Sequence, residues 1–284
     1  MSAKHIASKA VGKKGMAEHF KCILFMGLAC TSLSLTSNAQ TLYSSDFSGL
    51  TVGASVVGQD GWSLFSGNPS YATVQSDAGN NYLQLVGVTG GDGVRIIQEM
   101  PANAISSTEG VQFSLAFRTS SLSGVPFVVN MLGNSGSGYI TQMYVDANGT
   151  GIHVTADAGN FAFNETASFS SGLAAGVWYI ADVAIQPTDG TVNYSFYESV
   201  GNAPSQRGTK ILDASFALAN TSLTFNSVYS IDFAHDAFAS PVWDVDNIQV
   251  AVVPEPSVFG LLGLGVMAAF AMALSKKGRA SKCA

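Results

Sequence analysis

Hydrophobic and polar residues alternate along much of the chain between residues 40 and 252, and this pattern limits the fold more than any other feature. Val111, Phe113 and Leu115 fall on one side of an extended chain, whereas Gln112 and Ser114 fall on the other. Successive side chains of a strand point to opposite faces, so such a run predicts a strand buried on one side. The pattern favours strands at residues 42–47, 72–75, 82–86, 94–99, 111–117, 127–132, 139–145, 152–155, 177–186, 192–198, 229–233 and 243–250. We therefore expect an all-β protein.

Turn signals separate several of these segments. Asn148-Gly149 and Asp189-Gly190 each stand between two predicted strands, and both dipeptides suit tight hairpins because they tolerate positive φ. Stretches rich in Gly and Asn at residues 67–69 and 79–81 predict longer loops. About a dozen strands are more than an immunoglobulin-type sandwich needs. Residues 40–252 are therefore predicted to form one jelly-roll β-sandwich domain.

The C-terminal segment, residues 253–284, combines a proline-rich break, an apolar run and a basic end. Pro254 and Pro256 lack backbone N–H groups, so no helix should continue into this segment from the sandwich. Residues 258–274 carry no charge, and a helix rising about 1.5 Å per residue over this length can just cross a bilayer. The basic end, residues 275–284, is costly to place in hydrocarbon. We expect a single C-terminal transmembrane helix at 258–274 with its basic end in the cytoplasm.

Residues 1–39 have the layout of a secretory signal peptide. Five lysines precede an apolar stretch at residues 22–35, and Ser37-Asn38-Ala39 places small residues where signal peptidase cuts. We expect cleavage after Ala39. Two alternatives stay open here, namely translation from Met16 and lipid attachment at Cys30.

Charge is divided unevenly among these three parts. The chain has 13 Lys and Arg residues, 19 Asp and Glu residues and a net charge of −6. Only four of the basic residues but 17 of the acidic residues lie between positions 40 and 252, so this part is close to −13. Such a surface repels nucleic acid, whereas divalent cations and neutral polymers remain suitable partners. The three cysteines, Cys22, Cys30 and Cys283, lie outside this part, which is therefore expected to lack disulfides.

The C-terminal features resemble the PEP-CTERM sorting signal of Gram-negative bacteria that make exopolysaccharide. The resemblance rests on Pro254-Glu255-Pro256, the apolar run and the basic end, in that order. The basic end reads Lys-Lys-Gly-Arg, where arginine clusters are commoner in the family. The resemblance implies that an exosortase of the inner membrane cuts near the tripeptide. The rest of the protein would then reach the cell surface or the extracellular matrix.

The predicted sandwich resembles concanavalin A-like and laminin-G-like jelly rolls in five short motifs, which are Asp46-Phe47, residues 58–62, Leu83-Gln84-Leu85, Val177-Trp178-Tyr179 and residues 243–248. In such folds the first and last strands commonly pair, at a corner that holds structural calcium in related folds. The resemblance therefore implies that Asp46 meets Asp244 or Asp246 and that these carboxylates bind Ca²⁺. The alternative is that Asp46 caps a turn and that Asp246, with Asn247, solvates a sheet edge.

Sequence motifs for catalysis are missing from the predicted domain. Jelly-roll glucanases carry a Glu-x-Asp-x-Glu run that places paired carboxylates on one face, and the closest run here is Asp244 with Asp246, without a glutamate. His153 and His235 are the only histidines between positions 40 and 252, and no Gly-x-Ser-x-Gly run accompanies them. We expect a protein without enzymatic activity. The alternative is a carbohydrate-active enzyme, a glycosidase or lyase, on the same scaffold.

Sugar binding would require an aromatic side chain exposed on a concave face or a loop rim. Trp62 follows Gln59-Asp60-Gly61 and is the candidate platform, whereas Trp178 is expected to pack in the core. The sequence thus predicts an exported surface or matrix protein with a structural or adhesive role. The exopolysaccharide of its own cell is the candidate ligand.

Overall fold

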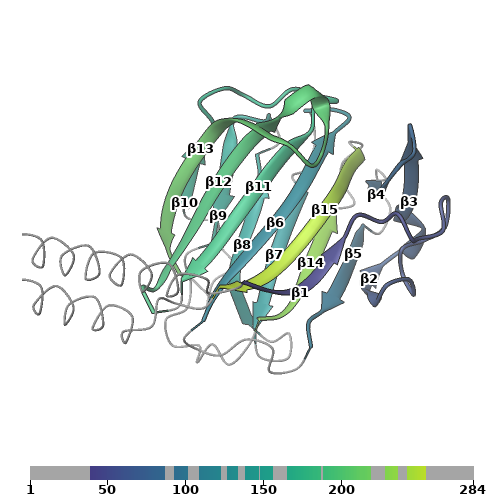
Figure 1. The fold of residues 1–284 in the computed structure, drawn as a ribbon, viewed down its shortest axis with the longest axis horizontal. Coiled ribbons are helices and arrows are strands. Elements are labelled where there is room, and N and C mark those ends of the chain that lie inside the picture. The colour runs from purple at the N-terminus through teal and green to yellow at the C-terminus, as the bar shows by residue number, and fades with distance from the viewer. Residues whose placement is uncertain are drawn as a thin grey trace, which may run out of the picture. The chain divides into compact units, whose positions relative to one another are not determined.

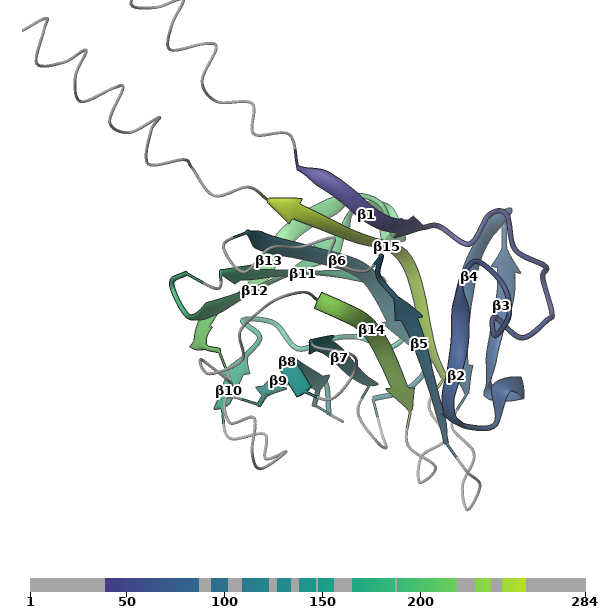
Figure 2. The ribbon, with the colours of Figure 1, turned by 90° about the horizontal axis from the view of Figure 1, so that it is seen from below.

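Two antiparallel sheets pack face to face and form a β-sandwich, as the two views in Figures 1 and 2 show. The computed structural model of the protein describes residues 39–86, 93–101, 109–122, 127–133, 138–146, 148–155, 165–186, 188–218, 228–235 and 242–253. Fifteen strands and the short 3-10 turns Pro69–Tyr71 and Val200–Asn202 make up the regular structure of these residues. The predicted all-β sandwich is confirmed.

The larger sheet, sheet A, has eight strands. Their order across the sheet is β13 (Arg207–Ala217), β12 (Thr191–Ser199), β11 (Tyr179–Gln186), β6 (Gly110–Thr119), β15 (Val242–Val253), β4 (Asn80–Val86) and β3 (Ala72–Asp77), while β1 (Gln40–Ser45) also pairs with β15.

Sheet B has seven strands. Their order is β10 (Glu165–Ser168), β9 (Gly151–Val154), β8 (Gly138–Val145), β7 (Phe127–Gly133), β14 (Val228–His235), β5 (Val94–Glu99) and β2 (Trp62–Gly67).

Strand β15 organises sheet A because three other strands pair with it. One edge of β15 pairs with β6 along most of its length. The other edge pairs first with β4, from Val242 to Val245, and then with β1, from Ile248 to Val252. The pairing of the first and last strands, which the resemblance implied, is therefore confirmed. A β-bulge between Asp246 and Gln249, with Asn247 at φ 47°, marks the place where β4 and β1 diverge.

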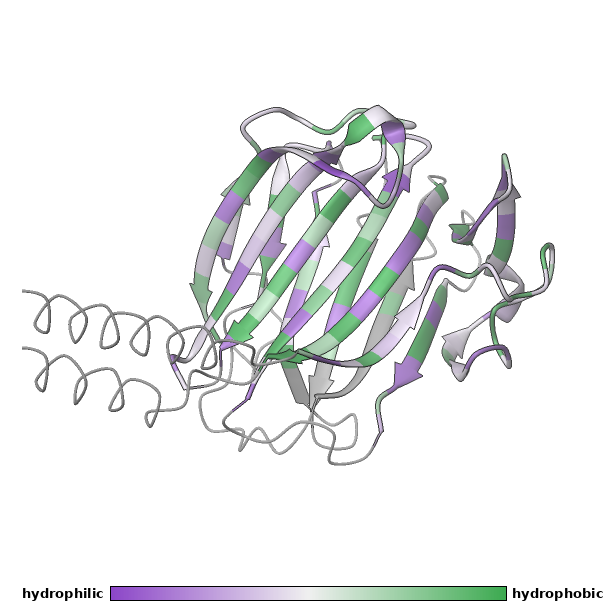
Figure 3. Ribbon diagram, viewed as in Figure 1, coloured by the Kyte–Doolittle hydropathy of each residue, from purple (hydrophilic) through white to green (hydrophobic). Residues whose placement is uncertain are grey.

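The core lies between the two sheets and follows the alternation of the sequence. Figure 3 shows hydrophobic and hydrophilic residues alternating along the strands of sheet A. Phe113, Leu115 and Phe117 of β6 are buried there, as is Phe233 of sheet B. A hydrogen bond between the hydroxyl groups of Thr141 on β8 and Tyr194 on β12 crosses this core. Burial raises the pKa of Tyr194 far above its usual value, so this phenol stays protonated and bound to Thr141.

Both predicted hairpins form. Asn148-Gly149 lies in the turn between β8 and β9, and Asp189-Gly190 lies in the turn between β11 and β12. The predicted loop at residues 79–81 is wrong. Ala78 and Gly79, at φ 51° and 86°, form a two-residue turn, and Asn80 already pairs with Asp77 across the hairpin.

The ends of the chain lie mostly outside the described residues. Of the predicted signal peptide only Ala39 is described, and of the predicted tail only Val253. None of the described segments is a helix with the length and hydropathy of a bilayer crossing. The predicted span at residues 258–274 and the motif Pro254-Glu255-Pro256 fall in the part that is not described.

Candidate functional site

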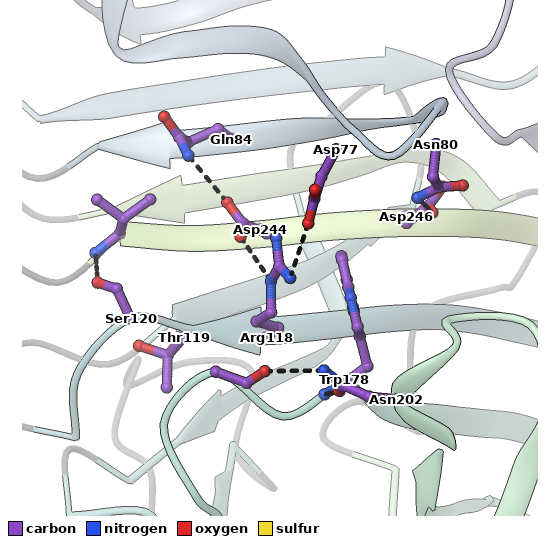
Figure 4. Close-up of polar contacts among 12 residues, drawn as sticks. Asp77, Asn80, Gln84, Arg118, Thr119, Ser120, Trp178, Asn202, Asp244 and Asp246 are labelled. Carbon is purple, nitrogen blue, oxygen red and sulfur yellow. Dashed lines mark hydrogen bonds and ion pairs between the residues drawn. The ribbon is translucent and has the colours of Figure 1, made fainter. Parts of the chain in front are cut away.

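The outward face of sheet A carries Arg118, which Figure 4 shows beside Trp178, Asp77 and Asp244. The guanidinium carbon of Arg118, on β6, lies 4.6 Å from the ring centre of Trp178 and 5.2 Å from that of Tyr82. Both rings are buried and pack edge to face, at 6.1 Å between centres. Such an arrangement is favourable because the arginine charge interacts with the electron-rich ring faces. Trp178 is buried, as expected, but its ring belongs to a small hydrophobic cluster separate from the main core.

Asp244 is the closer of two acidic partners of this arginine, and the other, Asp77, lies at 4.0 Å. The Oδ2 of Asp244 accepts a hydrogen bond of 2.8 Å from Nε of Arg118, and its Oδ1 accepts one of 3.1 Å from Nε2 of Gln84 on β4. Burial raises the pKa of Asp244, while Gln84 and Arg118 act in the opposite direction. Both oxygens of Asp244 thus have partners from neighbouring strands. Asp244, one of the three predicted calcium ligands, therefore belongs to a cluster with Arg118, Gln84, Tyr82 and Trp178, the Arg118 cluster.

Asp246 lies two residues further along β15, at the bulge, and is fully buried. Its Oδ2 accepts a 2.8 Å hydrogen bond from Nδ2 of Asn80, and its Oδ1 accepts a 2.7 Å bond from the backbone N–H of Asn247. Burial is the main cause that raises the pKa of Asp246 to about 6, and the negative charge of Asp46 adds to it. The expectation that Asp246 solvates a sheet edge is therefore wrong.

Asp46 follows β1 and is exposed. Its Oδ1 accepts hydrogen bonds from the backbone N–H of Ser48 at 3.0 Å and from the Ser48 hydroxyl at 2.7 Å, and these bonds lower its pKa. Asp46 thus caps a turn, as the alternative interpretation had it. Of the three predicted ligands, Asp46 and Asp246 are linked only by the effect of the Asp46 charge on the pKa of Asp246. Within the described residues no group of three or more His, Cys, Asp or Glu side chains could hold a metal ion, and the calcium site stays a prediction that rests on this pair.

A small polar pocket opens beside the bulge of β15. It has a volume of about 160 Å³ and is lined by Ser114, Leu115, Ala116, Ile180, Pro204, Ser205, Arg207, Asn247 and Gln249. Arg207 comes from β13, where its Nε and Nη2 donate to the two oxygens of Asp182 at 2.8 and 2.7 Å. Nη2 also donates to the hydroxyl of Ser114, at 3.1 Å. Sequence reasoning missed this pocket, because only the pairing of β6, β11 and β15 and the return of the chain into β13 bring its residues together.

The outward face of sheet B carries a different set of groups. Tyr144 of β8 and His153 of β9 are cross-strand partners whose rings stack at 4.4 Å between centres. On the same strand as Tyr144, Gln142 accepts a 3.1 Å hydrogen bond from the hydroxyl of Thr155. Tyr144 is partly exposed, so this face is a second candidate for a sugar contact.

The predicted sugar platform at Trp62 does not fit the structure. The Trp62 side chain is 1% exposed and packs in the core, with its ring 5.7 Å from that of Phe233. The preceding turn, with Asp60 and Gly61 at positive φ, directs the chain into β2 and the indole into the sandwich. A ring without exposed surface cannot stack on a ligand.

Comparisons with known proteins identify the C-terminal segment and the fold. The model of the PEP-CTERM protein-sorting motif matches residues 252–277. No curated protein is significantly similar to the chain. Among solved structures, a sialidase shares 13% identity at a TM-score of 0.51, but the match covers 75% of this chain and only 18% of the sialidase.

Two further solved structures match at nearly their full length. The winged bean acidic lectin, in complex with methyl-α-D-galactose, shares 10% identity at a TM-score of 0.50, with 76% of this chain and 99% of the lectin covered. Arcelin-5, a lectin-like defence protein from Phaseolus vulgaris, gives a TM-score of 0.49 at 10% identity, with the same shares covered. An identity of 10% with the winged bean lectin shows the fold and nothing more, and the arcelin-5 match adds no argument to it. The described residues thus form a lectin-like jelly-roll sandwich, and the chain carries a PEP-CTERM motif that marks it as an exported protein sorted by an exosortase.

Proposed function

We propose that this protein binds carbohydrate, without catalysis, at the cell surface or in the extracellular matrix of the cell that exports it. The observation that carries the proposal is the direct succession of a lectin-like sandwich and a sorting motif. Strand β15 ends at Val253, and the match to the motif begins at residue 252. The exported cargo is therefore the sandwich itself.

The processing steps follow from the two ends of the chain. Signal peptidase would remove residues 1–39 by cutting after Ala39. The apolar segment 258–274 would hold the protein in the inner membrane until an exosortase cuts near Pro254-Glu255-Pro256. The sandwich would then leave the membrane without its basic end.

The charge of the sandwich favours a neutral glycan as the partner. Positions 40–252 hold 17 acidic and four basic residues. Arg118, Arg207 and Lys210 each form an ion pair with an aspartate of the sandwich. A surface of this kind offers little to nucleic acid or to an anionic polymer.

The proposal of a binder rather than an enzyme is supported by the partners of three aspartates in sheet A. General acid–base cleavage of a glycoside needs two carboxyl groups free to face the scissile bond. Asp182 and Asp244 are both paired with arginine, and Asp246 is enclosed by Asn80 and Asn247. A glycosidase or lyase is the alternative function, and the experiment described next distinguishes it from a binding protein.

The test is a glycan array probed with the processed protein recovered from cells that export it. We expect selective, weak binding to neutral glycans, and no new reducing ends or unsaturated products when the same glycans are incubated with the protein. Product accumulation over time would establish the rival enzyme. Binding to no glycan at all would refute the proposed function.

A further inference from the structure

We propose that the pocket beside the bulge of β15 binds one neutral sugar unit, as the end or a branch of a longer glycan. This inference rests on the proposed function and adds the place and the kind of ligand. The pocket lies on the outward face of sheet A, on the side of the sheet away from the core.

Two side-chain amides in the pocket have hydrogen-bonding groups to offer. Asn247 and Gln249 both line it, and neither side chain makes a hydrogen bond to another residue within the described part of the chain. Each amide offers two N–H donors and one carbonyl acceptor. Adjacent hydroxyl groups of a sugar present donors and acceptors at similar spacing, so paired amides suit such a ligand.

The bulge in β15 determines where the side-chain amides of Asn247 and Gln249 lie. Gln249 lies opposite Ser114 and Asp246 lies opposite Ala116, so β15 holds one residue more than β6 over this interval. Asn247 takes up the extra residue at φ 47°, a left-handed conformation that asparagine tolerates better than most residues. Bulges of this kind redirect side chains, and this one brings Asn247 to the pocket beside Gln249.

Arg207 adds a donor whose position is fixed. Its bidentate pair with Asp182 and its bond to Ser114 use Nε and Nη2, so Nη1 takes no part in these contacts. Asp182 balances the arginine charge, and none of the lining residues is acidic. The site is therefore polar but without net charge, which fits a hydroxylated neutral ligand better than an anion or a cation.

The pocket offers little exposed apolar side-chain surface. Ala116 and Ile180 line it but are only 1% and 3% exposed, so a sugar would be held there by the polar groups of Asn247, Gln249 and Arg207. The volume of about 160 Å³ is well below the roughly 300 Å³ at which pockets for drug-sized ligands begin. One ring fits such a space, and the rest of the glycan would extend into solvent.

The experiment compares variants of the full-length protein, processed and exported by its own cell, on immobilised neutral glycans. Gln249→Ala and Asn247→Gly each remove one amide, and glycine keeps the positive φ that position 247 needs. Gln112→Ala is the matched control, because Gln112 lies exposed on the same face of sheet A, outside the pocket. Tyr144→Ala tests the rival site on sheet B. Thermal unfolding of each variant establishes that it is folded.

We expect each pocket variant to bind about tenfold more weakly, the loss of one hydrogen bond, while the control and Tyr144→Ala bind like the wild type. Binding of the wild type should change little between about 0.05 and about 0.5 M NaCl, because the ligand is neutral. If the wild type binds glycans and the pocket variants bind equally well, the site is wrong and the proposed function stands. Loss of binding in Tyr144→Ala alone would move the site to sheet B. A wild type that binds no glycan refutes both proposals.

Discussion

At the scale of single residues, Asp246 shows which part of a site the sequence can predict. The pairing of the first and last strands, expected from the jelly-roll motifs, brings Asp46 near Asp246. The enclosure of Asp246 was not predictable, because it depends on the tight turn at Ala78-Gly79 that places Asn80 beside β15. The Arg118 cluster was equally hidden, since Tyr82, Arg118 and Trp178 meet only through the registers of three strands.

The raised pKa of Asp246 predicts a specific pH dependence of stability. Its value of about 6 in the folded protein lies above the ordinary 3.8, so the folded state holds this proton more tightly than the unfolded chain does. The contribution of Asp246 to the free energy of unfolding is therefore fully present below about pH 4 and is lost as the pH rises through about 6. Two pKa units correspond to about 2–3 kcal/mol. The free energy of unfolding of Asp246→Asn minus that of the wild type should therefore be about 2 kcal/mol larger at about pH 7.5 than at about pH 4.

Urea denaturation at the two pH values measures this difference. Asp213→Asn is the control, since the pKa of Asp213 is lowered by Lys210 and by Ser195, and its contribution is lost as the pH falls. A difference between Asp246→Asn and wild type that is the same at both pH values would show that Asp246 does not carry this proton.

The calcium hypothesis makes a separate prediction for Asp46 and Asp246. A divalent cation between these two like charges would relieve the repulsion that contributes to the raised pKa of Asp246. Calcium at about ten times its Kd should raise the Tm of the wild type by about 3–6 °C, and Asp46→Asn should remove the shift. Differential scanning calorimetry with calcium and with magnesium measures the effect. An unchanged Tm at millimolar calcium would eliminate the site.

At the scale of elements, the sequence predicted most strands and missed three that lie at sheet edges. Strands such as β6 and β12 are paired on both sides and alternate clearly, so their periodicity is strong. The missed strands are β2 and β10, the two edges of sheet B, and β13, one edge of sheet A. Most of the side chains described in β2 and β10 are exposed, and the pairing of β13 with β12 is irregular at Tyr197. An edge strand can fold without alternation because its partner strand supplies the hydrogen bonds.

The turn between β3 and β4 carries the element-scale prediction. Ala78 has φ 51° and Gly79 has φ 86°, so an alanine occupies a left-handed position that it disfavours. Ala78→Asn would create the Asn-Gly pair that two-residue hairpins prefer. We expect it to raise the free energy of unfolding by about 0.5–1 kcal/mol.

Equilibrium denaturation measures the gain at this turn, and Gly79→Ala serves as the opposite control, because it places a second side chain at positive φ and should destabilise the protein. If Ala78→Asn were neutral or harmful, the turn would not have the backbone described here.

At the scale of the whole molecule, charge and hydropathy separate the cargo from its sorting segments. Five basic residues lie in positions 1–39 and four in the C-terminal tail, whereas the sandwich between them is strongly acidic. Basic residues beside an apolar segment hold that end of the segment at the cytoplasmic side of a membrane. The acidic charge of the sandwich opposes self-association, and without cysteine its fold does not depend on the redox state of its compartment. The composition thus matches the export that the PEP-CTERM motif implies.

Processing at the motif is the prediction that tests this division. Replacing Pro254, Glu255 and Pro256 together by alanine removes the tripeptide and also the two prolines that keep the segment extended. We expect the uncut protein, still carrying residues 258–274, to accumulate in the inner-membrane fraction, while Ser257→Ala, next to the tripeptide, is processed normally. Fractionation of the cells followed by mass spectrometry of both termini measures the outcome, and it also shows whether the N-terminus begins after Ala39. Normal release of the triple variant would mean that residues 254–256 do not direct the cut. A wild-type protein recovered from the cytoplasm with both ends intact would remove the basis for export, and with it the case for a glycan ligand outside the cell.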